Sequence, residues 1–444
     1  MVELKRAKPG LRAERAILVQ VFPYEAEEDA DETFAELADL TRTAGAVVAG
    51  QLRQKRRQPD ARYYLGKGKV KELLELVSDE DADVVICDDE LSPAQVRNLE
   101  NILDTKVVDR SEVILDIFAS HARTRQAKLQ VELAQLEYEF PRLKRRWTHL
   151  DRTAGGTLGG PVGGGIGVRG PGEKQLEVDR RLVQRRIHEM KKNLATIEKR
   201  RQTTVQGRKK RFTTVALVGY TNAGKSSLMN ALTAADVSVR DRPFETLDTR
   251  TRQWELPDGR QALLSDTIGF IRKFPHHLVS SFHATLEEAR EADLLLHVID
   301  ASRRNAQQEV EAGNEALRQV DCHETPTIYL LNKWDLVEDR SELPLLRKLI
   351  GDVVRTSATA AQGLDEVAGR VQRILDRDEA EYVVTTGVPD GRLAAFLHGS
   401  AQVLKRSSRG GTLRYHVRMK PECAGIVAGM GASVEPVGAE DAEG

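Results

Sequence analysis

Short apolar runs alternate with longer amphipathic stretches over the first quarter of the chain. Runs of aliphatic and β-branched residues, such as Ile17–Val19 and Val84–Ile86, are typical of buried parallel strands. The stretches between them, such as Ala94–Leu103, have helical spacing, and Ser92 followed by Pro93 is a typical helix start. This alternation predicts a small α/β domain.

The pattern changes near His121, where apolar residues begin to recur at the seam spacing of a coiled-coil helix. A second seam of similar length follows after one connection, which predicts two helices paired antiparallel as a hairpin. Pro141 is expected to kink or break the first helix. The seam residues are Leu129, Leu133, Leu136, Phe140, Leu143, Trp147 and Leu150 in the first helix and Val183, Ile187, Met190, Leu194 and Ile197 in the second.

Two further groups of apolar runs follow the predicted hairpin. The first group predicts buried strands of a larger α/β domain, at Val215–Val218, Ala262–Leu264, Thr327–Leu331 and Val353–Val354. Near the C-terminus, Tyr382–Val384 and the alternating Leu413–Met419 predict strands, with a helix from Leu393 to Leu404 between them. This last part is interpreted as a small α+β domain with an unstructured tail from Val437.

One segment carries phosphate-binding chemistry: Val215–Val218 leads into Gly219, Tyr220, Thr221, Asn222, Ala223, Gly224, Lys225, Ser226 and Ser227. Backbone N–H groups of such a turn, and of the helix that starts behind it, form a concavity for a β-phosphate. Lys225 adds positive charge toward the β- and γ-phosphates, and the Ser226 hydroxyl is suited to Mg²⁺. Because strand and helix patterns flank the segment, we interpret it as a P-loop rather than a chance match.

Three segments downstream complete a guanine-nucleotide site in the expected order. Asp266–Gly269 ends a strand; its Asp is expected to hold Mg²⁺ through water, and its Gly amide to reach the γ-phosphate. Asn332–Asp335 ends another, and the Asp335 carboxylate can accept hydrogen bonds from guanine N1 and N2, which selects GTP over ATP. A backbone amide of Ser357 or Ala358 is placed to meet the guanine O6.

The stretch between the P-loop and Asp266 is interpreted as a nucleotide-sensing loop. A Thr that contacts Mg²⁺ only when a γ-phosphate is present would act as a switch. Thr246 is the predicted ligand and Thr249 the alternative. Downstream of the P-loop, the residues predicted to bind GTP are Phe244, Glu245, Thr246, Leu247, Asp248, Asp266, Thr267, Ile268, Gly269, Asn332, Lys333, Asp335, Ser357 and Ala358.

The connection within the predicted hairpin is rich in glycine and flanked by positive charge. Ten of the eighteen residues from 155 to 172 are glycine, so the segment is expected to be disordered on its own. One interpretation is a flexible linker. The other is a loop that orders against RNA at the tip of a basic stalk, because Lys and Arg cluster between residues 142 and 211. That concentration in an otherwise neutral chain favours a polyanionic partner.

Composition sets outer limits on the function. The chain has 444 residues, 40% of them hydrophobic, and a net charge of −1. Its three cysteines have no metal-binding spacing, which suits a reducing compartment. No secretory signal and no apolar run long enough to span a membrane are visible. We therefore expect a cytoplasmic monomer whose contacts with nucleic acid come from local basic patches.

These residues together resemble the HflX family of ribosome-associated GTPases. The resemblance is carried by Gly219–Ser226, Phe244–Asp248, Asp266–Arg272, Tyr64–Lys69 and the end of the glycine-rich tract, Gly170–Lys174. It covers most of the chain, although Thr249-Arg250-Thr251 stands where the family has Pro-Thr-Thr.

The resemblance implies a GTPase that binds the large ribosomal subunit and whole 70S-type ribosomes. It also implies that the N-terminal region points toward the peptidyl transferase centre, that stalled ribosomes are split under stress such as heat, and that the N-terminal domain binds ATP. A GTP-dependent assembly or binding factor without splitting activity is the alternative. A regulator of a protein partner is a third interpretation.

The catalytic residues are less defined than the nucleotide site. Where Ras-like GTPases have a Gln that orients the attacking water, this chain has Phe270, which cannot hydrogen-bond water. Intrinsic hydrolysis is therefore expected to be slow and to be completed by a partner or by a monovalent cation. Asn222 is the predicted K⁺ ligand; its alternative role is to fix the loop by local hydrogen bonds.

Two motifs of the N-terminal region stay open between two interpretations. Gly66–Lys69 suits either an anion at a helix start or a turn followed by solvated lysines. Asp88–Glu90 suits either a metal or ribose site or an acidic loop.

Taken together, the sequence predicts an α/β chain in four parts. These are an N-terminal α/β domain (1–120), an antiparallel helical hairpin with a glycine-rich tip (121–211), a P-loop GTPase domain (212–377) and a small C-terminal α+β domain with a disordered tail (378–444).

Overall fold

The computed structural model describes most of the chain as two compact units. The first unit holds Met1–Ile197 with the short segments Arg242–Leu247 and Ile271–His283, and the second holds the remainder. The described residues are 13–24, 27–154, 171–209, 212–233, 250–267, 269–273, 288–303, 306–319, 321–338, 343–376, 379–387, 391–409 and 411–437.

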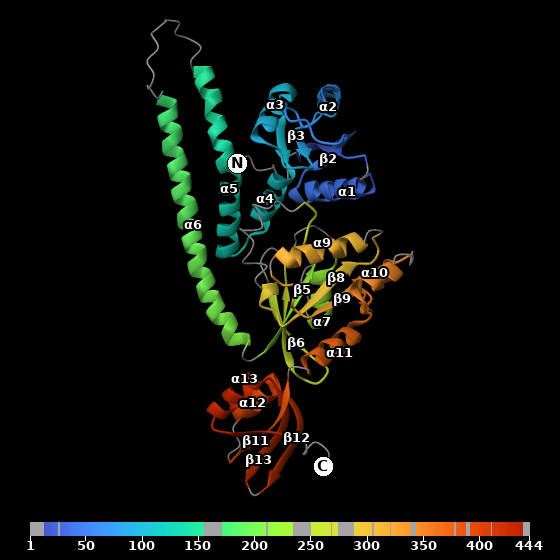
Figure 1. Cartoon of the computed structure of the whole chain (residues 1–444), viewed down its shortest axis with the longest axis vertical. Helices are drawn as coiled ribbons and strands as arrows, with labels where there is room; N and C mark the ends of the chain where they lie inside the picture. The colour runs from blue at the N-terminus through green and yellow to red at the C-terminus, as the bar shows by residue number, and fades with distance from the viewer. Residues whose placement is uncertain are drawn as a thin grey trace. The chain divides into compact units, whose positions relative to one another are not determined.

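A four-stranded parallel sheet in the order β2-β1-β3-β4 forms the centre of the first unit (Figure 1). Nearly every residue of β1 is buried, so helices are needed on both faces. Helices α2 and α3 pack through Leu73 and Leu99 on one core, while α1 packs with α4. The elements are β1 (Arg15–Phe22), α1 (Glu27–Ala44), β2 (Val47–Lys55), α2 (Lys67–Asp79), β3 (Val84–Cys87), α3 (Pro93–Leu103), β4 (Lys106–Asp109) and α4 (Arg110–His121). The predicted α/β domain is confirmed.

Two long helices, α5 (Arg125–Ala154) and α6 (Pro171–Lys209), form the predicted antiparallel hairpin. The Arg180 guanidinium lies 5.2 Å from the centre of the Phe140 ring, and Arg186 pairs with Glu132 at 3.0 Å, so numbers rise along one helix as they fall along the other. Pro141 was expected to kink or break this helix, and the break is wrong, since α5 continues through it. Packing of the helix before Pro141 into the first unit's core, through residues such as Val131 and Ala134, compensates for the lost N–H. The glycine-rich residues 155–170 lie outside the described ranges.

A six-stranded sheet in the order β10-β9-β8-β5-β7-β6 forms the centre of the second unit. All neighbouring strands are parallel except β6 and β7, which form an antiparallel hairpin. The elements are β5 (Thr213–Gly219), α7 (Lys225–Thr233), β6 (Arg250–Glu255), β7 (Gln261–Asp266), β8 (Leu294–Asp300), α9 (Ala306–Gln319), β9 (Thr327–Asn332), the 3₁₀ turn η1 (Trp334–Leu336), α10 (Leu343–Ile350), β10 (Val353–Arg355) and α11 (Leu364–Leu375). The four apolar runs predicted as buried strands are β5, β7, β9 and β10.

The C-terminal part of this unit is an antiparallel sheet in the order β12-β13-β11-β14 with two helices. The predicted helix Leu393–Leu404 is wrong at its end, because Val403 and Leu404 belong to a strand that pairs with β13. That pairing is non-local, so local spacing could not reveal it. The elements are β11 (Ala380–Thr386), α12 (Gly391–Ser400), β12 (Gln402–Arg409), β13 (Thr412–Met419), α13 (Pro421–Gly429) and β14 (Ser433–Pro436).

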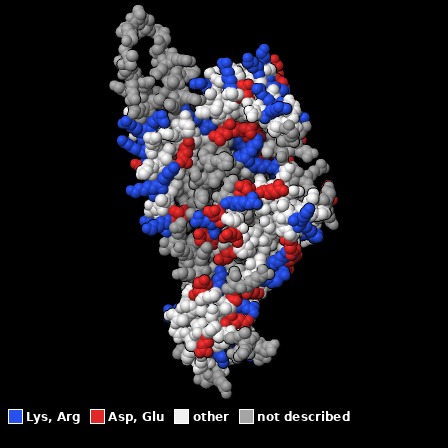
Figure 2. Space-filling model, in the orientation of Figure 1, with Lys and Arg blue, Asp and Glu red and all other residues white. Residues whose placement is uncertain are grey.

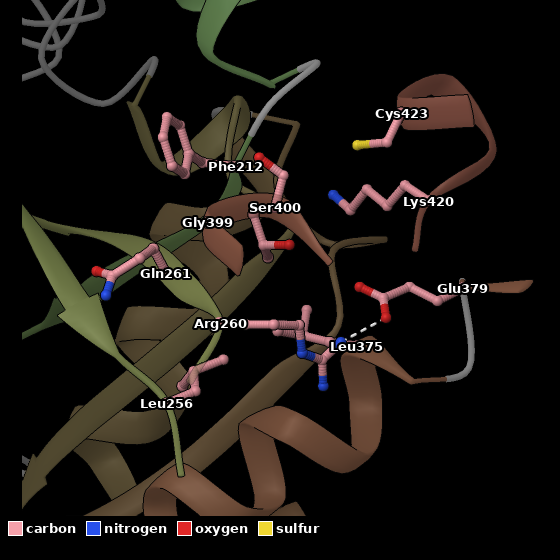
Figure 3. A pocket seen from close by; sticks show the side chains of 11 residues that line it. Phe212, Leu256, Arg260, Gln261, Leu375, Glu379, Gly399, Ser400, Lys420 and Cys423 are labelled. Atoms are coloured by element: carbon pink, nitrogen blue, oxygen red, sulfur yellow. Dashed lines mark hydrogen bonds and ion pairs between the residues drawn. The ribbon is translucent and has the colours of Figure 1, made fainter. Parts of the chain in front are cut away.

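A buried arginine joins the C-terminal sheet to the larger sheet of the same unit. Arg260, which is 5% exposed, pairs with Asp258, Asp376 and Glu379, as Figure 3 shows for Glu379. Arg260 keeps its charge there, because these carboxylates raise its pKa although burial opposes it. The hollow beside Arg260 is about 20 Å³, room for roughly one water and far too small for a nucleotide.

Two further findings bear on the composition. Cys87, Cys322 and Cys423 are buried, and none of the three forms a disulfide. No helix in the described ranges combines the length and apolar character that crossing a membrane requires.

Candidate functional site

Two glycines shape the phosphate loop between β5 and α7. Gly219 has φ +140°, and a Cβ there would lie 2.1 Å from the Val298 carbonyl oxygen. Gly224 has φ +91°, and a Cβ there would lie 2.3 Å from Asn332 Nδ2. Only glycine fits both positions, because each combines a left-handed backbone with close contact. The loop therefore turns tightly enough to open α7 at Lys225, with the first amides of that helix directed at the turn.

Lys225 is buried and its ammonium contacts only backbone carbonyls among the described residues. Its Nζ donates to the carbonyl oxygens of Gly219 and Tyr220, at 3.0 and 2.6 Å. Burial lowers the pKa of Lys225 to about 8, although Asp266 and Glu309 favour the charged form. A buried ammonium that is bonded only to neutral carbonyls lacks a counter-charge. An anion bound beside it, such as a phosphate, is therefore strongly stabilised.

An oxygen pair fit for Mg²⁺ lies at the start of α7. The Ser226 hydroxyl donates to Asp266 Oδ2 at 2.6 Å, and Asp266 is 1% exposed. Hydroxyl, carboxylate and phosphate oxygens are the ligands that Mg²⁺ prefers. The described residues hold no group of three or more His, Cys, Asp and Glu side chains suited to a metal, so phosphate oxygens would have to complete such a site.

Asn332 connects the phosphate loop with the loop after β10. Its Nδ2 donates to the Ala223 carbonyl at 2.9 Å, and its Oδ1 accepts from the Ala358 amide at 3.3 Å. The neighbouring Lys333 has φ +57° and pairs with Asp300 at 2.8 Å. The predicted base-binding segments thus meet through one buried side chain.

The predicted guanine contacts lie at the open end of this arrangement. Asp335 is exposed in η1, and its Oδ2 lies 3.5 Å from Thr359 Oγ1. Ser357 is buried, and its hydroxyl accepts from the Ala360 amide at 3.0 Å, which shapes the loop that carries Ala358. The exposed Asp335 carboxylate can accept hydrogen bonds from the edge of a base.

The Asp266–Gly269 segment returns to the phosphate loop. The Phe270 amide donates to the Gly219 carbonyl at 2.9 Å, and the Thr221 amide donates to the Phe270 carbonyl at 2.8 Å. The Phe270 ring is 8% exposed and packs edge-on against Tyr220, so both rings lie in the core and not in the nucleotide site. The Thr267 hydroxyl likewise faces inward and donates to the Leu217 carbonyl at 2.6 Å.

Some predicted residues have no structural description. Phe244, Glu245, Thr246, Leu247, Asp248, Thr249 and Ile268 lie outside the described ranges. Among the others, Ser227 is half-buried in the first turn of α7 and Asn222 is half-buried with φ +64°.

Three residues of the site were not predicted from the sequence. Asp300 holds Lys333, Thr356 donates to Asn332 Oδ1 at 3.3 Å, and His297 packs against Phe270. Asp300 could have been found, because a carboxylate at the end of an apolar run marks the edge of a parallel sheet. Thr356 and His297 give no comparable signal.

The acidic Asp88–Glu90 segment of the first unit is held by protein partners. Asp88 is fully buried and pairs with Arg110 and Lys273, both at 2.8 Å. Asp89 accepts from Lys273 and from the Tyr64 hydroxyl, both at 2.6 Å. These pairs use the carboxylates that a metal or ribose would need, which supports the interpretation as a structural acidic loop.

Comparisons with known proteins give matches along the chain. Family models described as "GTP-binding GTPase N-terminal", "GTP-binding GTPase Middle Region" and "50S ribosome-binding GTPase" match residues 31–119, 121–208 and 214–333. A GTPase HflX of Lacrimispora saccharolytica is 45% identical over 385 residues, covering 86% of each chain. The chain belongs to the HflX family of GTPases. The HflX of Escherichia coli K12 is 40% identical over 412 residues, 91% of this chain and 93% of its own.

Membership explains why the geometry of the second unit is that of a GTPase. The HflX relatives align over most of the chain, and the family model for the middle region covers the hairpin. The relatives therefore share the N-terminal domain and the hairpin as well as the nucleotide-binding domain. The chain is a GTP hydrolase of a ribosome-binding GTPase family.

Proposed function

We propose that this HflX-family GTPase binds the large ribosomal subunit and splits stalled ribosomes under stress, and that GTP hydrolysis resets the bound form. The observation that carries the proposal is the joining of a P-loop with its base-binding segments and a basic helical arm in one chain. Lys and Arg gather along α6, at the left of Figure 2. They include Arg180, Arg181, Arg185, Arg186, Lys191, Lys192, Lys199 and Arg200.

The arm has the properties of a surface that contacts RNA phosphates. Arg185 and Lys192 are exposed on α6, whereas the seam residue Met190 is buried. Arg186 and Lys191 lie nearer to α5, where they pair with Glu132 and Glu137. Lys and Arg that neutralise phosphates release counterions, so binding through such an arm falls steeply with salt. The match to a family model described as "50S ribosome-binding GTPase" supports ribosomal RNA as the polyanion.

The roles proposed for the site residues follow their positions. Gly219–Ser227 cradle the β-phosphate, Lys225 and the Gly269 amide meet the γ-phosphate, and Asn332–Asp335 with Ala358 read guanine. Ser226, Thr246 and Asp266 through water would hold Mg²⁺, which supplies charge neutralisation at the phosphates. The loop Phe244–Asp248 would sense the γ-phosphate.

Asn222 is proposed as a K⁺ ligand that compensates for Phe270. K⁺ beside the phosphates would neutralise transition-state charge as an arginine finger does. Asn222→Gly tests this role, because glycine tolerates the φ of +64° and removes the side chain that carries the ligating oxygen. Turnover that is faster in K⁺ than in Na⁺, with the difference lost in Asn222→Gly, supports the proposal. Equal turnover of the unaltered protein in both salts contradicts it.

Light scattering of intact ribosomes tests the splitting function. Adding the protein with GTP is expected to lower the scattering, and an assembly or binding factor without splitting activity would leave it unchanged. Arg185→Glu with Lys192→Glu on α6 should weaken both subunit binding and splitting. The matched control is Arg347→Glu with Lys348→Glu, an equal charge change at exposed positions of α10. Equal loss in both variants would show that the arm is not the binding surface.

Four further properties belong to the proposal. The chain is expected to be a cytoplasmic monomer that works in four parts bounded near residues 120, 211 and 377. ATP binding by the N-terminal domain is supported by its open parallel sheet, a fold that binds nucleotides at its strand ends. Asp88 does not add to that support, because Arg110 and Lys273 already pair with its carboxylate. Sedimentation and ATP titration of the purified protein test the oligomeric state and the second nucleotide.

A further inference from the structure

A histidine lies in the middle of the most buried strand of the GTPase sheet. His297 is 1% exposed in β8. The other residues of this strand from Leu294 to Ile299 are apolar. Its Nδ1 has no hydrogen-bond partner among the described residues, and burial together with the Lys225 charge lowers its pKa to about 4. The side chain is therefore a neutral imidazole with a buried polar atom that costs stability. An apolar residue would fill this strand position without that cost.

The imidazole is one of four rings that contact one another in series. Phe270 meets it edge-on, with ring centres 6.3 Å apart and planes at 78°. The Tyr329 ring packs against the imidazole with ring centres 5.3 Å apart, and Tyr220 packs against Phe270. Gly313 of α9 makes room for it, since a Cβ there would lie 2.8 Å from the imidazole Cε1. The place of the Phe270 ring is thus set by the shape of the pocket around His297.

The backbone of Phe270 transmits that placement to the phosphate loop. Its amide and carbonyl both bond to the loop, which aligns the preceding Gly269 against Thr221 and Lys225. A Cβ on Gly269 would lie 2.7 Å from the Thr221 nitrogen and 2.8 Å from Lys225 Nζ. Gly269 therefore lies beside the ammonium that meets the γ-phosphate in a P-loop. For Lys225 and the Gly269 amide both to bind a γ-phosphate, Gly269 would have to move from its place beside the ammonium, a step that GDP does not require.

We propose that His297 is a positioning residue that sets the preference between GTP and GDP by anchoring Phe270 and, through it, Gly269. Weakening the anchor frees Gly269 and favours the nucleotide that carries a γ-phosphate. The inference depends on GTP binding alone and not on the ribosomal partner.

The test measures the affinities of GDP and of the slowly hydrolysed analogue GTPγS for the full chain in Mg²⁺. His297→Val suits a strand, removes Nδ1 and no longer reaches Phe270. Gly313→Ala forces the imidazole out of place by adding a methyl group where the ring now lies. In each variant the ratio of Kd for GTPγS to Kd for GDP is expected to fall roughly three- to tenfold, the size of a lost aromatic contact. The GDP affinity itself should stay unchanged.

Two controls separate positioning from general damage. Gly369→Ala in α11 makes the same chemical change where no atom lies within 4 Å of the new methyl group, and it should leave the ratio unchanged. The double variant His297→Val/Gly313→Ala should match the single variants rather than sum them, because both act on one contact. Should His297→Val fail to fold, Gly313→Ala and Phe270→Leu carry the same test. An unchanged ratio, or equal weakening of both nucleotides, overturns the proposal.

Discussion

Two lysines, Lys225 and Lys273, lie at the edges of different parallel sheets and differ in their electrostatic surroundings. Lys225 is buried against carbonyls, and burial lowers its pKa to about 8. Lys273 contacts Asp88 and Asp89, which raise its pKa although burial opposes them. The two sheet edges therefore differ in charge balance. In the second unit no carboxylate is bonded to the Lys225 ammonium, whereas in the first unit Asp88 and Asp89 neutralise Lys273. The first arrangement favours an anionic ligand, and the second favours stability.

The same contrast extends to the aspartates of the two edges. Asp109 is fully buried and bonded to Arg142 at 3.0 Å, while burial raises its pKa and Arg142 works against that rise. Asp335, at the base end of the nucleotide site, is exposed. Substitutions at the second unit's edge should therefore change binding, and substitutions at the first unit's edge should change stability.

Asp335→Asn is expected to have the largest effect, and it acts on binding. The carboxylate accepts from guanine N1 and N2, and an amide there leaves one base donor facing another donor. GTP affinity should fall roughly 10²- to 10⁴-fold, as for other lost charged hydrogen bonds to a base. Xanthosine triphosphate, which has a carbonyl in place of the guanine amino group, should regain much of the loss. Titration with both nucleotides measures the switch.

Asp365→Asn, an exposed substitution of the same kind in α11, is the matched control for Asp335. It should leave the affinity for GTP intact. If Asp335→Asn binds both nucleotides as the unaltered protein does, Asp335 does not read the base.

The second prediction concerns stability at the edge of the first unit. Asp88→Ala leaves Arg110, only 2% exposed, with a weakened set of partners, and removing one member of a buried pair costs about 3–5 kcal/mol. Hydrogen exchange at peptides that cover β3 and β4 should accelerate accordingly. Asp79→Ala, exposed at the end of α2, is the control.

Lys225→Met is the reciprocal substitution in the second unit. It removes a buried ammonium without a carboxylate bonded to it, so protection of β5 and β7 should stay level or increase while nucleotide binding is lost. Strong destabilisation by Lys225→Met, or none by Asp88→Ala, would remove the distinction between the two edges.

The sequence predicted the residues of the second unit's phosphate loop, but it did not predict the partners of Asp88 in the first unit. A phosphate site is built from consecutive backbone groups, so Gly219–Ser226 could be read locally, as could the cap on α3, where Ser92 accepts from the Gln95 amide. The Asp88 cluster draws on residues as distant as Glu36 and Lys273, which only the folded chain brings together. No local spacing encodes such a set of partners.

Glu112 gives the fourth prediction, a pH dependence of the first unit. Burial and the nearby Asp109 charge raise its pKa to about 7 from an ordinary 4.5, while Lys106 and Arg142 oppose the rise. The folded form therefore binds more protons than the unfolded form between about pH 4.5 and 7, so stability falls as pH rises through that range. The total loss should be about 1–3 kcal/mol.

Hydrogen exchange at α4 and β4, corrected for the intrinsic effect of pH, measures this loss. Glu112→Gln should flatten the pH profile and be more protected than the unaltered protein above about pH 7. Glu75→Gln, exposed on α2, should keep the original profile. A profile that stays steep in Glu112→Gln would assign the pH dependence to another group.

Lys273→Ala should have the smallest effect and shows which cation matters at the first unit's edge. Lys273 is 40% exposed, whereas Arg110 is 2% exposed and also pairs with Glu36 at 2.6 Å. Because water screens the exposed ammonium, its removal should cost only about 0.2–1 kcal/mol at β3, far less than Asp88→Ala. Lys273→Met, which keeps the apolar stem, should cost less still. If Lys273→Ala instead matches Asp88→Ala in hydrogen exchange, then Lys273 and not Arg110 is the principal partner of Asp88, and the edge depends on the segment that follows Gly269.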